Sequence, residues 1–210
     1  LVVVDADPEH LVLHEIHRVV RRPEVADYIR VPLADVLDRA EVVVARVERV
    51  DRDAREVHLD DGDRLPYDYA AICLGSVTAY HGLPGVREHS TPLKSVADAE
   101  RIREEFLALD AGERVVVGGA GLSGVQVAGE LAALAREADR DVDVTLLERL
   151  DSVAPSFPEN FRAAVREALE GQGVAVRTGV AVERATADGL ETDAGPVAAD
   201  QLVWTGGITG

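Results

Sequence analysis

Three glycines in the second half of the sequence have the spacing of a diphosphate-binding turn. Gly119, Gly121 and Gly124 follow an apolar run over 114–118 that predicts a buried strand, and they precede helical spacing over about 123–138. The first glycine permits a tight turn, the second lets the backbone approach a pyrophosphate, and the third lets the helix pack against the strand. Unpaired N–H groups at the positive helix end would bind the diphosphate. The pattern predicts a dinucleotide site that also includes Ala120, Leu122 and Ser123.

A carboxylate at the end of the next predicted strand supports this interpretation. The apolar run over 142–147 predicts that strand, and Glu148 follows it directly. An acid at this position accepts hydrogen bonds from the adenine ribose hydroxyls and repels a 2′-phosphate. We therefore expect NAD(H) rather than NADP(H), although the adjacent cation Arg149 keeps the second possibility open. The alternative is a glycine-rich turn that packs a helix on a strand without any nucleotide.

The segments around this motif alternate between predicted strands and helices. Ser95 and Asp98 have the spacing of an N-terminal cap, and apolar residues at helical intervals continue to Leu109. A second helix is predicted over 158–172, and further strands over 174–177, 182–185, 190–192 and 201–204. This alternation is typical of the α/β class with a parallel sheet. We expect a Rossmann-like NAD-binding domain whose sheet is accompanied by a β-meander.

The first part of the sequence begins with strand character. The run Leu1–Val4 predicts a buried strand closed by Asp5. Helical spacing follows over 8–22, and weakly alternating strands are predicted over 41–50 and 56–59. From residue 41 onward the segment therefore reads as one β-rich unit.

An acidic turn and an apolar run complete this unit. Asp60, Asp61 and Asp63 surround a glycine, and this composition predicts a hairpin turn. A calcium loop is not expected, because the remaining ligands of such a loop are missing. The run over 69–74 ends at Gly75 and predicts a central parallel strand.

Several motifs, taken in order, resemble one family of flavoproteins. Residues 118–131, which read GGAGLSGVQVAGEL, look like the NAD-binding motif of the pyridine nucleotide-disulphide oxidoreductases and are most similar to that of the type II NADH dehydrogenases. Residues 67–76 resemble a strand of that family's FAD domain, and 83–95 resemble the linker into its NAD domain. Residues 202–207, which read LVWTGG, look like the crossing back to the FAD domain. Each short motif is common, but their order and spacing are specific.

The resemblance implies two dinucleotide-binding domains. Residues 1–94 would form part of an FAD-binding Rossmann-like domain with a β-hairpin insertion, and residues 95–210 the NAD(H)-binding domain. NADH would pass a hydride to FAD, and the flavin would reduce a quinone or a similar acceptor. By the same resemblance Asp5 would hold the FAD ribose and Gly75 would lie close to the flavin nucleotide.

One position departs from the family pattern. The family usually has Glu two residues after the third glycine, near the place where nicotinamide meets flavin, and Gln126 stands there. Because Gln carries neither charge nor proton, a general-base role there is in doubt. Glu130 lies one helical turn further on the same face and either substitutes for that acid or has a structural role. Gln126 and Glu130 are the catalytic candidates, and Gly206 and Gly207 are expected to line the same meeting point.

The sequence opens inside an apolar run and contains no methionine, so we expect it to be part of a longer protein. The resemblance places one flavin-binding motif before Leu1 and another after Gly210, together with the region that contacts membrane and quinone. We therefore expect NAD(H) to bind these residues, and FAD to be retained only by the full-length protein.

The charge balance excludes one class of partner. Thirty-nine Asp and Glu residues against 22 Lys and Arg give a net charge of −17, which disfavours binding to nucleic acid. All basic residues except Lys94 are arginine, and with the acidic surplus this composition suggests a salt-adapted, halophilic cytoplasm. No apolar stretch approaches the roughly 20 residues of a membrane span, so we expect a cytoplasmic protein with at most peripheral contact to the inner face of the membrane.

Other reactive residues are expected to be structural. Cys73 stands alone inside an apolar run, so a buried core thiol is expected and a disulfide-reductase type is disfavoured. His10, His14 and His17 would share a face of the predicted helix, but a metal site there is not expected. Trp204 is expected in the core.

Two other classes of function remain as alternatives. One is another NAD(P)H-dependent flavoprotein reductase of the same architecture, such as a ferredoxin or rubredoxin reductase or an NADH oxidase. The other is a nucleotide-binding module without catalysis.

Overall fold

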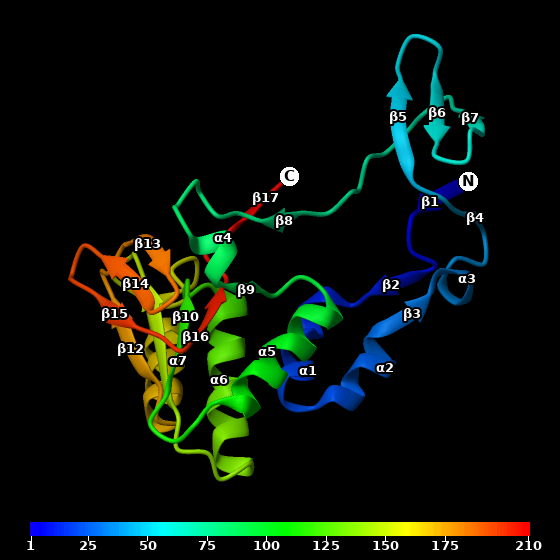
Figure 1. Ribbon diagram of the computed structural model, residues 1–210. Helices are drawn as coiled ribbons and strands as arrows, with labels where there is room; N and C mark the ends of the chain where they lie inside the picture. Colours follow the sequence, from blue (N-terminus) through cyan, green and yellow to red (C-terminus); the bar gives the residue numbers. More distant parts are fainter. The chain divides into compact units, whose positions relative to one another are not determined.

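The computed structural model describes all residues from 1 to 210 and divides them into two compact units (Figure 1). The first unit comprises Leu1–Val12 and Asp27–Gly75, and the second comprises Leu13–Ala26 and Ser76–Gly210. The assignment of residues 1–94 to flavin binding and of 95–210 to NAD(H) binding stays a prediction. No helix is both long and apolar enough to cross a bilayer.

A parallel sheet forms the centre of the second unit. Its five strands lie in the order β12-β11-β10-β16-β9, and every neighbouring pair is parallel. Their bounds are β9 Thr91–Pro92, β10 Arg114–Gly118, β11 Asp143–Glu148, β12 Ala175–Thr178 and β16 Gln201–Trp204. The α/β class with a parallel sheet, expected from the alternating pattern, is confirmed.

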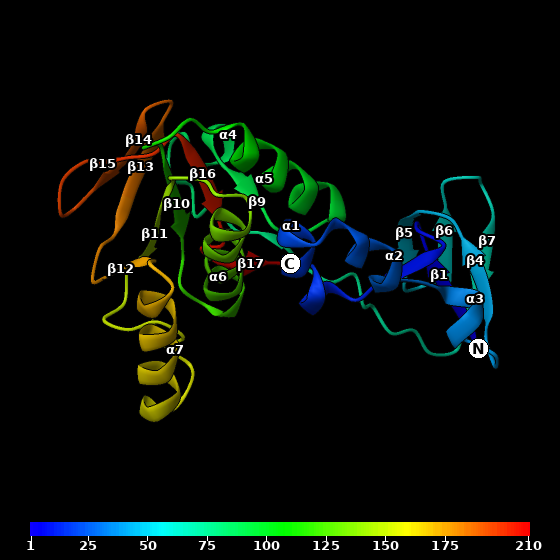
Figure 2. The ribbon, with the colours of Figure 1, turned by 90° about the horizontal axis from the view of Figure 1, so that it is seen from below.

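Helices cover one face of this sheet. The helices α5 (Val96–Ala108) and α6 (Leu122–Glu137) contact β9, β10, β11 and β16, and α7 (Glu159–Gly171) contacts β12 (Figure 2). Ser95 begins α5 with the expected capping box, in which its hydroxyl accepts from Asp98 N and the Asp98 carboxylate accepts from Ser95 N. Covering helices bury the apolar side chains of the sheet, which is why its strands read as continuous apolar runs.

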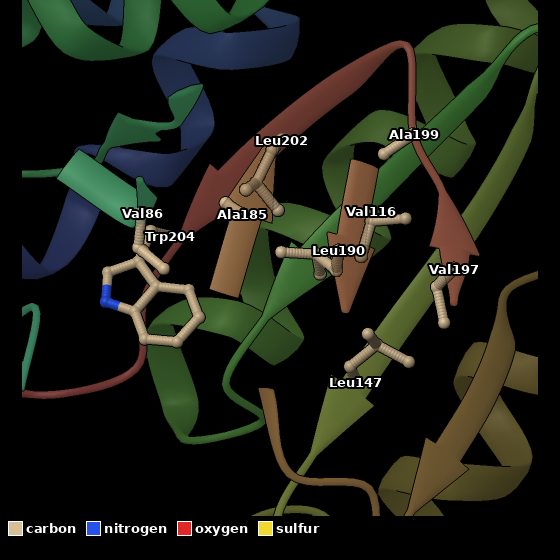
Figure 3. Packing of buried hydrophobic residues seen from close by; sticks show 9 residues of the cluster. All are labelled: Val86, Val116, Leu147, Ala185, Leu190, Val197, Ala199, Leu202 and Trp204. Atoms are coloured by element: carbon tan, nitrogen blue, oxygen red, sulfur yellow. The ribbon is translucent and has the colours of Figure 1, made fainter. Parts of the chain in front are cut away.

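An antiparallel meander covers the other face. It consists of β13 (Val182–Thr186), β14 (Gly189–Thr192) and β15 (Val197–Ala198). Figure 3 shows the buried cluster that joins meander, sheet and the short helix α4 (Val86–His89). The cluster contains Val86, Val116, Leu147, Ala185, Leu190, Val197, Ala199, Leu202 and Trp204. The predicted core position of Trp204 is thus confirmed, and the predicted meander is present.

A short segment from early in the chain belongs to the second unit. It contains the 3₁₀ turns η1 (Leu13–Glu15) and η2 (Pro23–Val25) and the helix α1 (His17–Arg21), which packs against α5 and α6. Its side chains Ile16, Val19 and Val20 are buried. Arg103 on α5 donates to the carbonyls of Val20 and Arg21. These carbonyls at the C-terminal end of α1 have no donor within the helix, so Arg103 supplies one. Two further short strands, β8 (Val77–Thr78) and β17 (Ile208–Thr209), pair antiparallel.

The first unit is built from small sheets. The strands β1 (Val2–Asp5) and β4 (Glu41–Val44) pair in parallel, whereas β2 (Glu9–Leu11) and β3 (Arg30–Pro32) pair antiparallel. The helices α2 (Ala26–Ile29) and α3 (Leu33–Val36) lie before and after β3. A three-stranded antiparallel sheet follows, formed by β5 (Val47–Asp51), β6 (Glu56–Leu59) and β7 (Arg64–Pro66). Residues 60–63 join β6 to β7, as the predicted turn requires.

Three predictions for this part of the chain are wrong. The helix predicted over 8–22 is limited to α1, because residues 9–11 form a ladder with β3 and tertiary pairing overrides the helical spacing. The strand predicted over 69–74 does not form, because no other strand supplies the ladder hydrogen bonds that a strand needs. Tyr69 and Leu74 are consequently 96% and 86% exposed, and Cys73 is exposed rather than buried.

Candidate dinucleotide site

The glycine turn joins the end of β10 to the start of α6. Gly119 has φ +99°, and a Cβ placed on it would lie 2.7 Å from Thr205 O and 2.8 Å from the Gly206 Cα. Only glycine combines this backbone conformation with such a close approach. The predicted tight turn at Gly119 is therefore present.

The two other glycines differ in their surroundings. A Cβ on Gly124 would lie 1.8 Å from Gly119 O, so this glycine lets α6 approach the turn. Gly121 has ordinary backbone angles, and a Cβ placed on it would meet no atom within 4 Å. The side of the turn at Gly121 is thus open, which is what close approach of a diphosphate requires.

The turn's own backbone groups are paired within the protein. Gly119 N donates to Leu147 O at 2.8 Å, and Ala120 O accepts from Ala154 N at 2.7 Å. Ala120 N donates to Glu148 Oε2 at 2.7 Å, and Gly119 O accepts from Thr205 Oγ1 at 2.9 Å.

The N–H groups that come next along the chain are different. The first N–H groups of an α-helix have no acceptor within the helix, and in α6 these belong to Leu122, Ser123 and Gly124. Gly121 provides no side-chain cap for them. Leu122 is 45% exposed. These N–H groups can bind an anion, and the helix dipole favours one there.

Glu148 is held at the edge of the turn. Its Oε2 accepts from Ala120 N, and its Oε1 accepts from Leu150 N at 2.8 Å. A carboxylate has about four acceptor sites, so both oxygens keep capacity for ribose hydroxyls. The neighbouring Arg149 is exposed and has no hydrogen bond to the turn.

The two catalytic candidates lie further along α6. Gln126 is half-buried. The Oε2 atom of Glu130 lies 2.7 Å from Arg21 Nε, and these side chains are only 16% and 21% exposed. Arg21 also contacts Glu137 at 3.3 Å. Because Glu130 is engaged with α1, its position supports the structural role rather than the catalytic one.

The three histidines do not form the expected helical face, since His10 lies in β2 and His14 in η1. His17 lies on α1, and its Nδ1 is buried without a hydrogen-bond partner. Burial lowers the pKa of His17 from its ordinary value, and the negative charge of Glu130 partly opposes this shift.

The residues after β16 pack against the turn from the other side. The indole of Trp204 fills the space beside both Gly118 and Gly206, where a Cβ would lie 2.6 Å and 2.4 Å from the ring. Trp204 Nε1 donates to Ala79 O at 2.9 Å. The imidazole Nε2 of His81 lies 2.9 Å from Gly206 O. Sequence reasoning did not identify His81, whose contact joins segments far apart in the chain.

The chain matches the family described as "Pyridine nucleotide-disulphide oxidoreductase" over residues 9–210. It belongs to this family. A Bacillus subtilis NADH dehydrogenase-like protein is 27% identical over 208 residues, which cover 99% of this chain and 57% of that protein. A type II NADH:quinone oxidoreductase of Staphylococcus epidermidis is 25% identical over 195 residues, which cover 82% and 48%.

The fold is also found in a solved structure. The structure of NDH2 from Plasmodium falciparum in complex with NADH superimposes with a TM-score of 0.83 at 16% identity, covering 99% of this chain and 50% of that one. The chain thus spans about half the length of the relatives that it matches.

Two residues that the family resemblance assigns to the flavin, Asp5 and Gly75, lie in the first unit. Asp5 ends β1, and its Oδ1 accepts from Asp7 N. Gly75 has φ +73°, and a Cβ placed on it would meet no atom within 4 Å. Since no glycine precedes Gly62, this unit contains no glycine turn before a helix. These residues alone do not form a cradle for the FAD diphosphate.

Proposed function

We propose that the second unit binds NADH, and that the chain contributes this site to a flavin-dependent NADH:quinone oxidoreductase. The observation that carries the proposal is the division of hydrogen bonds at the turn. The Gly119–Ala120 backbone is fully paired inside the protein, while the first N–H groups of α6 have no side-chain cap and the space beside Gly121 is open. Such an arrangement is suited to a diphosphate.

Each residue of the site has a defined task in this proposal. The α6 N–H groups after Gly121 hold the NADH diphosphate, and Glu148 accepts the adenine ribose hydroxyls. Gln126, Gly206 and Gly207 line the nicotinamide end. NADH supplies the hydride and FAD, when bound, accepts it, so the protein's part is to bind, orient and exclude water.

The acceptor is proposed from the relatives, which include type II NADH:quinone oxidoreductases. A quinone acceptor dissolves in the lipid bilayer, so we propose peripheral contact with the cytoplasmic side of the membrane. The charge of −17 leads us further to propose a salt-rich cytoplasm, in which ions screen the repulsion between an acidic protein and anionic NADH.

The experiment that tests the function is an activity assay. The product of the complete gene, expressed and purified with FAD, is mixed with NADH and a quinone, ferricyanide or oxygen. We expect NADH oxidation that depends on FAD and is fastest with quinone. Turnover with ferricyanide or oxygen but not with quinone would indicate the alternative reductase class, and NADH binding without turnover would indicate a module without catalysis.

A further inference from the structure

We propose that Thr205 is a positioning residue that fixes the orientation of the Gly119–Ala120 peptide, and thereby aims the N–H groups of α6 at the ligand. The inference rests on the proposed NADH site. Thr205 follows β16, which lies directly beside β10 in the sheet (Figure 1). Its hydroxyl therefore reaches the turn from a segment that is far away in sequence.

The hydrogen bonds of Thr205 single out one carbonyl. Thr205 N donates to Gly118 O at 2.8 Å, as a continuation of the ladder between β10 and β16. The hydroxyl Oγ1 lies 3.1 Å from Gly118 O and 2.9 Å from Gly119 O. Gly118 O thus has a backbone donor, whereas Gly119 O depends on the hydroxyl. Removal of that hydroxyl would leave the Gly119 carbonyl without its donor.

The same peptide is held from the opposite side. Ala120 N donates to Glu148 Oε2 at 2.7 Å, and Glu148 ends β11, the other neighbour of β10. One peptide plane is therefore fixed at its oxygen by Thr205 and at its nitrogen by Glu148. The two side chains come from the two strands that flank β10.

The peptide needs this restraint because a glycine precedes it. Glycine occupies regions on both sides of φ = 0 with similar ease, so steric exclusion alone does not fix the orientation at Gly119. Rotation of the peptide would exchange the places of its C=O and N–H and turn the backbone entering α6. If the turn has to become ordered when the ligand binds, its loss of entropy makes the binding free energy less favourable, and the affinity for the ligand is lower.

Thr205 also touches the beginning of α6. A Cβ on Gly124 would lie 2.7 Å from Thr205 Oγ1 as well as 1.8 Å from Gly119 O. The hydroxyl therefore lies where the turn and the first turn of the helix meet. Serine could place the same hydroxyl there, whereas valine has the shape of threonine but no donor.

Three variants separate positioning from general stability. Thr205→Val removes the donor, and Thr205→Ser keeps it. Thr192→Val is the control, because the buried Thr192 likewise donates to a backbone carbonyl, that of Gly195, but lies in the meander. Each variant is titrated with NADH by nicotinamide fluorescence, its unfolding is followed in urea, and exchange of the Ala120 amide is measured by NMR without ligand.

We expect Thr205→Val to weaken NADH binding about fivefold, the effect of one hydrogen bond, and to speed exchange of the Ala120 amide. Thr205→Ser should restore both values to within about twofold. Thr192→Val should lower stability and leave both values unchanged.

Unchanged Ala120 exchange in Thr205→Val would overturn the inference, and so would equal losses of affinity in Thr205→Val and Thr192→Val. If wild-type protein binds no NADH but Thr205→Val still speeds the exchange, the proposed function fails and the positioning role stands.

Discussion

The carboxylate of Glu148 and the backbone N–H of Ala120 are joined by a hydrogen bond of 2.7 Å. This contact connects the end of β11 to the glycine turn that follows β10. A second bond, from Leu150 N to Oε1, fixes the other carboxylate oxygen. The acid that is expected to select the nucleotide is therefore held in place by two backbone donors.

Replacement of this carboxylate should change nucleotide preference. In Glu148→Gln an oxygen can still accept from Ala120, but the negative charge is lost. We expect NADH affinity to fall about tenfold, because hydrogen bonds to charged groups are the stronger ones, and the preference for NADH over NADPH to narrow. Titration with both nucleotides checks this. Glu167→Gln on the exposed side of α7 is the control, and an unchanged NADH-to-NADPH ratio in Glu148→Gln would contradict the role of Glu148.

The ion pair between Arg21 and Glu130 should contribute stability rather than catalysis. Glu130→Gln removes the closer and more buried of the two carboxylates that face the largely buried guanidinium of Arg21, so the free energy of unfolding in urea should fall by about 2 kcal/mol. Glu170→Gln removes an exposed pair with Arg166 on α7 and should cost less than about 0.5 kcal/mol. If Glu130→Gln lowered the hydride-transfer rate and left stability intact, Glu130 would be catalytic.

His17 should make stability depend on pH in a defined window. Its pKa is lowered in the folded protein, so the unfolded chain binds the proton more readily, and stability is lost as pH falls through and below about 6.5. The pKa of Asp51 is lowered to about 2 by hydrogen bonds from Ala54 N and Arg49. Protonation of Asp51 therefore lowers stability only below about pH 4.

Urea unfolding at pH 7.5 and 5.5 measures the His17 effect apart from that of the acids. His17→Gln should show a smaller loss between these two pH values than the wild-type protein. An equal loss in both proteins would assign the pH dependence to other groups.

Salt should strengthen NADH binding. Both the protein, at −17, and NADH are anionic, so screening of their long-range repulsion outweighs screening of the local attraction at the start of α6. We expect the Kd for NADH to decrease as KCl rises to the order of 1 M. A steady increase in Kd over this range would show that local attraction dominates.

The central part of this site could be predicted from local patterns in the sequence. Strand β10 was predicted with its observed bounds, and α6 to within one residue at each end. The reason is that a buried parallel strand, a glycine turn and an amphipathic helix follow one another directly, so each boundary is marked by its own residues.

Features that depend on distant partners could not be predicted in this way. Residues 69–74 have the composition of a central strand, but a strand also requires a neighbour. Cys73 became exposed for the same reason. The role of Thr205 could not be predicted, because its carbonyl partner Gly119 lies in the turn after a distant strand, and the contact exists only after β10 and β16 have paired.

The central claim, that the open side of the glycine turn binds NADH, is tested most directly by titrating residues 1–210 with NADH in parallel with Gly121→Val. A Cβ on residue 121 would meet no atom within 4 Å, so we expect Gly121→Val to fold normally and yet fill the space that the diphosphate needs. Gly171→Val, at another open position, is the control. The account predicts saturable binding by wild-type and Gly171→Val protein, and a loss of at least about 100-fold, or about 2.7 kcal/mol, in folded Gly121→Val. Equal NADH affinity in all three proteins would contradict it.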